Sequence, residues 1–164
     1  RVLQAWKQVP EAPPFVLAGG ATGWKNSQIL RQINELPPDR IYRTGRISDT
    51  ELAELYSGAD FFLFPSLYEG YGLPVLEAMA CGCPVITSNI SSLPEVAGDA
   101  ALLVNPESVE EIAGAIRRLS GNPELRETLR EKGLKQAGKF SWSKAATEHA
   151  KIFRETVTAF RKNK

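Results

Sequence analysis

Strand-like runs of four residues alternate with helix-like segments along the first 104 residues of the chain. The runs occupy residues 15–18, 41–44, 61–64, 84–87 and 101–104. The segments between them carry apolar residues at helical spacing, as Ile29 and Ile33 do within residues 24–34. This alternation predicts an α/β fold with a mostly parallel sheet and helices on both faces. The continuous apolar run at 61–64 predicts a strand that is buried on both faces.

Polar residues mark the starts of several helices. Ser48 and Glu51 form a capping box, and Ser92 is predicted to cap a short helix in the same way. Three helices close the chain, and their predicted starts are Ser108, Asn122 and Ser141. The last of them carries an apolar stripe: Trp142, Ala146, Ala150, Phe153, Val157 and Phe160. Two interpretations stay open, packing on the domain's own sheet and a partly uncovered patch that favours self-association.

Composition describes an ordinary globular domain. The 164 residues are 43% hydrophobic and 24% charged, which predicts a single domain over residues 1–164, with 141–164 as its C-terminal helix. A net charge of +1 gives no indication of a nucleic-acid partner. No apolar run reaches the roughly 20 residues that span a bilayer. The tail 151–164 has five Lys or Arg and one Glu, which fits either a solvated helix end or a peripheral contact with an anionic membrane.

The two cysteines indicate a reducing compartment. Cys81 and Cys83 flank one glycine, which is too short a separation for a comfortable disulfide. His149, the sole histidine, lies far from them, so no zinc ligand set is present and His149 is expected to have a surface or packing role. We therefore expect small, buried thiols and a cytoplasmic protein.

Two loops contain candidate phosphate-binding glycines. Residues 19–25 follow a strand and precede a helix, but only Gly20 and Gly23 have the spacing of the dinucleotide fingerprint. A tight strand-to-helix turn is the alternative interpretation of this loop, and it is the one that we favour. The loop that follows residues 61–64 is more informative, because it joins two glycines, Gly70 and Gly72, to a helix start.

Two carboxylates accompany that second loop. Glu69 lies within it, and Glu77 lies about one turn into the helix that begins near Leu73. The free N–H groups of a helix start and its dipole attract anions, while carboxylates accept hydrogen bonds from hydroxyl groups. A nucleotide-sugar offers both kinds of group. The alternative is that Glu69 is a surface loop residue and Glu77 an exposed helix residue.

These residues lie within a longer pattern that resembles a known family. The pattern consists of Pro65-Ser66, Glu69-Gly70-Tyr71-Gly72-Leu73-Pro74, Glu77-Ala78-Met79-Ala80, Gly82, Pro84-Val85-Ile86, Leu93-Pro94-Glu95-Val96 and Gly98-Asp99-Ala100. It resembles the signature of the retaining glycosyltransferases of family 4, also called group 1. Their GT-B architecture places two Rossmann-like domains across a cleft. The resemblance covers about residues 3–160 and corresponds to the C-terminal, donor-binding domain. It implies that the last helix, within 141–164, is a crossover helix that returns to cover the N-terminal domain.

The resemblance implies a role for each motif residue. Glu69 would hold hydroxyls of the donor sugar beside the anomeric carbon and act as the catalytic-site carboxylate, and Glu77 would bind the ribose hydroxyls. The backbone amides of the intervening loop would contact the sugar and the diphosphate: Gly70, Tyr71, Gly72 and Leu73. The turn against the base would be Gly45, Arg46 and Ile47. The resemblance implies no metal and no cofactor, with a nucleotide-diphosphate sugar as co-substrate.

The implied activity is transfer of a hexose with retention of configuration. The stretch 88–95 is more similar to mannosyltransferases than to starch or sucrose synthases, so we expect a GDP- or UDP-hexose donor and a role in polysaccharide or glycolipid synthesis. In such enzymes an Arg and a Lys after the first strand contact the diphosphate, and both would lie before Arg1. The chain is therefore expected to lack the first strand and the N-terminal acceptor domain, and to be inactive alone.

Three rival functions stay open. The first is a non-catalytic nucleotide-sugar-binding module. The second is a glycoside hydrolase that uses Glu69 and Glu77 as its carboxylate pair, although such an enzyme has no need of an anion-binding helix start. The third is a nucleotide-sugar epimerase, a class that lacks the pattern described above.

Overall fold

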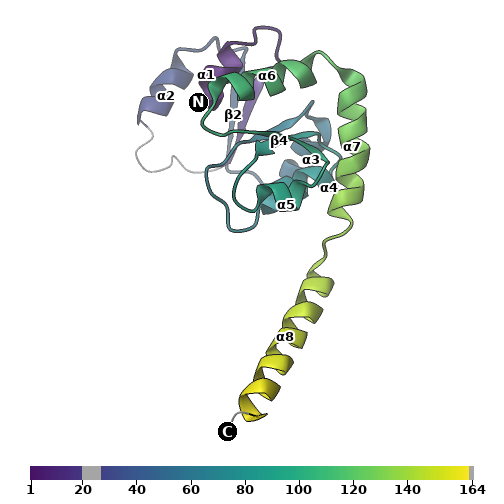
Figure 1. The fold of residues 1–164 in the computed structure, drawn as a ribbon. Helices are drawn as coiled ribbons and strands as arrows, with labels where there is room; N and C mark the ends of the chain where they lie inside the picture. Colours follow the sequence, from purple (N-terminus) through teal and green to yellow (C-terminus); the bar gives the residue numbers. More distant parts are fainter. Residues whose placement is uncertain (20–26, 163–164) are drawn as a thin grey trace.

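The computed structural model describes residues 1–19 and 27–162, and the elements follow the predicted alternation (Figure 1). The helices are α1 (Val2–Lys7), α2 (Ser27–Asn34), α3 (Asp49–Gly58), α4 (Leu73–Ala80), α5 (Leu93–Ala97), α6 (Val109–Ser120), α7 (Pro123–Ala137) and α8 (Trp142–Lys162). The strands are β1 (Phe15–Ala18), β2 (Ile41–Gly45), β3 (Phe62–Phe64), β4 (Val85–Ser88) and β5 (Ala101–Val104). The predicted beginning of the second helix, together with Gly20 and Gly23, lies outside the described residues.

All strand pairs in the described part of the chain are parallel, but the strands form two sheets. β1 pairs with β2 in one sheet, and the other has the order β3-β4-β5. The α/β class and the parallel pairing are confirmed. The predicted missing strand stays a prediction, since the structure describes only this chain.

Side chains from both faces of β4 build the core. Ile86 packs into a cluster with α1 and α6, whereas Val85 belongs to a cluster that includes α4 and α5. Neighbouring residues of a strand point to opposite faces, so the helices cover this sheet on both sides, as the sequence predicted. All four residues of β4 are buried.

The prediction that the run 61–64 is buried on both faces was wrong. The strand there is β3, and each of its residues is only partly buried. β3 lies at the edge of its sheet and pairs only with β4, so one side of the strand has no neighbouring strand in that sheet. The fully buried strand is β4 instead.

Helix α7 crosses α4 at close range. A Cβ atom built on Gly133 would lie 3.3 Å from Cγ of Met79, which is fully buried. The side chain of Gln136, one turn further along α7, donates a hydrogen bond of 2.9 Å to the carbonyl of Val96 in α5. Helices α4, α5 and α7 therefore form one packed group behind the three-stranded sheet.

Helix α8 points away from the rest of the domain (Figure 1). Its predicted stripe is exposed: Trp142 by 80%, Phe153 by 66% and Phe160 by 65%. The alternative in which this stripe packs on the domain's own sheet is therefore wrong, while self-association stays a prediction. Over the described residues, none of the helices combines the length and the apolar character that crossing a bilayer requires.

Candidate functional site

The loop of residues 65–72, between β3 and α4, leaves the sheet at the carboxyl end of β3. Its last residue, Gly72, has a φ of 103° and is the N-cap of α4. A Cβ atom at this position would lie 2.8 Å from Cδ2 of Leu93, a fully buried side chain. Two independent features therefore require glycine at position 72, the left-handed backbone and the close approach of α5. Pro74 follows in the first turn of α4, where its fixed φ suits a helix start.

The loop presents backbone donors with no internal partner. Among the residues that the structure describes, no acceptor meets the N–H groups of Gly70, Tyr71 and Gly72. These groups precede the start of α4, where the helix dipole adds partial positive charge. Successive free N–H groups at a helix start form an anion site, so the loop has the electrostatic character that a phosphate needs.

Glu69 is partly buried, and its backbone is held from a neighbouring turn. The hydroxyl of Ser91 donates to the Glu69 carbonyl at 2.7 Å and accepts from the Glu69 N–H at 3.2 Å. The hydroxyl of Ser92 donates to the same carbonyl at 3.0 Å. Within the described part of the chain the carboxylate of Glu69 has no hydrogen-bond or ion-pair partner, so it is available to a ligand.

Glu77 projects from the second turn of α4 and is exposed. Its charge acts on Tyr56 in α3: burial, and after it the negative charge of Glu77, raises the pKa of Tyr56 to about 12. No cation pairs with Glu77 among the described residues. The structure therefore supplies two carboxylates near one helix start, one in the loop before it and one on the helix itself.

The turn that the resemblance assigned to the base follows β2. Gly45 has a φ of 68°, and the hydroxyl of Thr44 donates to its carbonyl at 2.9 Å. Arg46 is exposed and Ile47 is partly buried. Over the described residues, no hydrogen bond joins this turn to the loop 65–72. The structure thus places the turn at the end of a strand, while its role towards a base stays a prediction.

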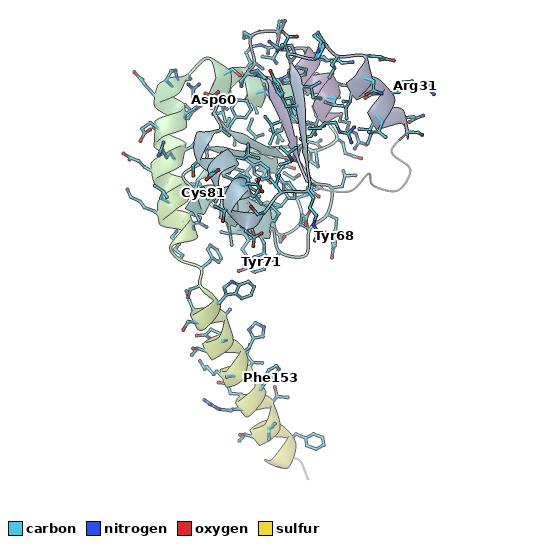
Figure 2. The ribbon with its side chains drawn as sticks, turned by 180° about the vertical axis from the view of Figure 1, so that it is seen from behind. Arg31, Asp60, Tyr68, Tyr71, Cys81 and Phe153 are labelled. Carbon is cyan, nitrogen blue, oxygen red and sulfur yellow. The ribbon has the colours of Figure 1, made fainter. Side chains whose placement is uncertain are left out.

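Tyr68 and Tyr71 lie along one margin of the domain, on the exposed side of the loop (Figure 2). Tyr68 is 80% exposed, whereas the ring of Tyr71 makes an edge-on contact with Phe140, with 6.4 Å between the ring centroids. Phe140 lies in the connection between α7 and α8. The loop therefore touches the segment from which α8 departs.

Other residues with reactive side chains lie outside this site. Both cysteines are free; Cys83 is buried, and burial raises the pKa of its thiol to about 12. His149 lies on α8, with Nδ1 2.8 Å from the carbonyl oxygen of Ala145. Residues 1–19 and 27–162 contain no group of three His, Cys, Asp or Glu side chains placed to hold a metal ion.

Sequence reasoning missed the two serines that hold Glu69. It gave Ser92 a capping role and Ser91 none, but the structure shows no side-chain cap from Ser92, whose hydroxyl bonds to Glu69. The available signal was their position: they lie three and four residues after the end of β4, the strand that pairs with β3. Hydroxyls at that place can reach the loop that leaves β3, because parallel neighbours end at the same edge.

Comparisons with known proteins agree with this geometry. Residues 1–136 match the family described as glycosyl transferases group 1. The chain is 38% identical, over 152 residues, to the O-antigen chain mannosyltransferase B of Escherichia coli. That alignment covers 90% of this chain and 40% of the relative, so the chain spans well under half of the relative's length.

Solved structures show the same fold. The sucrose-phosphate synthase of Thermosynechococcus elongatus superposes with a TM-score of 0.82 at 31% identity, over 96% of this chain and 42% of that one. HepE of Anabaena, solved in complex with UDP-glucose, has the same TM-score at 21% identity, over 94% of this chain and 44% of that protein, and it supports the fold alone. The fold, the loop between β3 and α4 and the sequence similarity agree, and the chain belongs to the group 1 glycosyl transferases, which have the GT-B architecture.

Proposed function

We propose that this chain is the donor-binding domain of a retaining hexosyltransferase and binds a nucleotide-diphosphate sugar at the loop 65–72. One observation carries the proposal. Among the described residues, three N–H groups without an acceptor and a carboxylate without a hydrogen-bond partner lie next to one another at the start of α4. The N–H groups suit the diphosphate, and the carboxylate suits the sugar hydroxyls.

Each site residue has a distinct part in this proposal. Glu69 binds hydroxyls of the sugar beside its anomeric carbon, and Glu77 accepts hydrogen bonds from the ribose. The N–H groups of the loop from Gly70 to Leu73 face the diphosphate, while the turn at Gly45–Ile47 lies against the base. When the sugar leaves, negative charge grows on the phosphate, and fixed N–H donors stabilise that charge without having to reorganise.

The donor in this proposal is a GDP- or UDP-hexose. The mannosyltransferase activity that names the relative at 38% identity favours mannose as the sugar of the donor. The acceptor, in synthesis of a polysaccharide or a glycolipid, would bind outside this domain. Since the chain spans 40% of that relative, turnover is assigned to the longer enzyme.

The test is calorimetric titration of the chain with UDP, GDP and ADP, and then with UDP-glucose and GDP-mannose. We expect one base to be preferred, with an affinity that EDTA leaves unchanged. Glu77→Ala should weaken binding of the nucleoside diphosphate by roughly tenfold, because two charge-assisted hydrogen bonds to the ribose are lost. Glu127→Ala is the matched control, since Glu127 is an exposed helical glutamate on α7.

The outcomes separate the proposal from its alternatives. Absence of binding by a folded chain, or equal weakening by both substitutions, would contradict the assignment of the site. If the chain binds the donor but the longer enzyme transfers no sugar, a non-catalytic binding module is the correct description.

A further inference from the structure

The turn after β4 holds the backbone of Glu69 with three hydrogen bonds from two hydroxyl groups. Ser91 both donates to and accepts from the backbone of Glu69, and Ser92 donates to the same carbonyl. These residues are 22 and 23 positions from Glu69 along the chain, so the contact is tertiary rather than local. One loop residue is thereby fixed at both its N–H and its C=O.

Ser91 adopts an unusual backbone conformation at this contact. Its φ is 62°, and it is the one non-glycine residue with positive φ in the described part of the chain. The left-handed region is unfavourable for an L-residue, and it persists only where surrounding contacts fix it. Glycine would adopt this backbone at no such cost, but it has no hydroxyl to offer Glu69.

The contact completes a series of hydroxyl bonds between two neighbouring segments. Thr87 donates to the carbonyl of Phe64 at 2.9 Å, and Ser88 donates to that of Ser66. The bonds from Ser91 and Ser92 extend the series to Glu69. The inner bonds fasten the end of β3, whereas the outer ones reach the residue whose carboxylate is free for a ligand.

We propose that Ser91, with support from Ser92, is a positioning residue for Glu69 and holds its backbone at the place from which the carboxylate reaches the donor sugar. This inference rests on the proposed function of the loop 65–72. The carboxylate has no partner of its own within the described residues, so the Glu69 backbone sets the place from which the side chain can reach a ligand. Three hydrogen bonds fix that backbone, and the hydroxyl of Ser91 makes two of them.

The decisive variant is Ser91→Gly, because it relieves the left-handed strain and removes the hydroxyl at once. We expect the midpoint of urea unfolding to stay constant or to rise. The affinity for the preferred sugar nucleotide, GDP-mannose or UDP-glucose, should fall by about threefold to tenfold, which corresponds to one or two net hydrogen bonds. The affinity for GDP or UDP alone should not change, because the proposed function assigns Glu69 to the sugar and Glu77 to the ribose.

A double-mutant cycle tests whether Ser91 acts through Glu69. Glu69→Gln lowers the affinity for the sugar nucleotide, and addition of Ser91→Gly should then lower it no further. Ser57→Ala is the control, since the hydroxyl of Ser57 also bonds to a backbone carbonyl, that of Ala53 at 2.8 Å, but on α3.

The results separate this inference from the proposed function. If the unmodified chain binds neither nucleoside diphosphates nor their sugars, both proposals are overturned. If it binds them and Ser91→Gly leaves the sugar-nucleotide affinity intact, or weakens GDP and sugar nucleotide equally, only the positioning role is overturned. Additive losses in the double mutant would likewise exclude action through Glu69.

Discussion

The two sheets of the domain differ in how fully they are covered. In the three-stranded sheet every residue of β4 is buried between helices on both faces. In the two-stranded sheet Val16 of β1 is 44% exposed and Tyr42 of β2 is 51% exposed. The candidate sugar-binding loop is fastened to the first sheet, whereas the turn assigned to the base follows a strand of the second. We therefore expect stability and sugar recognition to depend on the first sheet far more than on the second.

The largest effect is expected from a cavity in the covered sheet. Ile86→Ala removes a fully buried side chain from β4 and should lower the free energy of unfolding by about 2–5 kcal/mol. Val16→Ala, on the exposed side of β1, should cost less than about 1 kcal/mol. Urea unfolding of both variants measures the difference, and equal losses would mean that the two sheets contribute alike.

Two glycines with positive φ give a second comparison. Gly72 and Gly45 have φ values of 103° and 68°, but a Cβ atom meets Leu93 only at position 72, and nothing lies within 4 Å at position 45. Gly72→Ala combines backbone strain with overpacking and should cost about 2–4 kcal/mol. Gly45→Ala has the strain alone and should cost about 1–2 kcal/mol. Urea unfolding in the absence of ligand measures the two losses of free energy. A Gly72→Ala variant as stable as the unmodified chain would refute the packing seen at α5.

Alkaline pH should weaken the covered sheet specifically. Tyr56 packs in the cluster with α4, and its pKa is raised from 10.0 to about 12 in the folded chain. Its contribution is complete below pH 10 and is lost as pH rises from 10 towards 12, because only the unfolded chain ionises freely there. Tyr56→Phe should therefore flatten the fall of the urea midpoint above pH 10.

Tyr68→Phe is the control for this titration, since Tyr68 is 80% exposed and lies on the loop rather than in the core. If the urea midpoint of Tyr56→Phe falls with pH as steeply as that of the unmodified chain, Tyr56 is not the cause. The loss of stability would then be assigned to the buried thiol of Cys83, whose pKa is also raised.

The smallest effect concerns α3, which connects the two sheets. The hydroxyl of Ser48 accepts from the N–H of Glu51, whose carboxylate accepts from the N–H of Ser48. Ser48→Ala should cost about 1 kcal/mol through loss of this cap. Ser57→Ala, near the other end of the helix, should change the midpoint of urea unfolding very little. Equal losses of stability in the two variants would mean that the cap at Ser48 does not stabilise α3.

Local patterns were sufficient to predict most of the elements. The five strands and the capping of α3 by Ser48 lie within a residue or two of their predicted places, because side-chain periodicity and caps involve residues within about four positions. The sequence also predicted that the loop 65–72, with Glu69 in it, joins a strand to a helix start and that Glu77 lies on that helix.

Contacts between distant residues were beyond such patterns. The hydroxyl of Ser92 has two available uses, a cap for α5 or a bond to Glu69, and only the packed structure decides between them. The incomplete burial of β3 depends on its place at the edge of a sheet, which alternation along the chain does not encode. The exposure of the α8 stripe likewise depends on the direction in which the chain leaves α7.

The close contact between Gly133 and Met79 limits how this domain can vary. A Cβ atom at position 133 would lie 3.3 Å from Cγ of Met79, so any larger residue there requires a shift of a few tenths of an ångström in α7 or in the Met79 side chain. A deletion or insertion of one residue within either helix would rotate this contact by about 100° around the helix axis and replace it by another pair of residues. We therefore expect changes in chain length to be tolerated best in the connections outside these two helices.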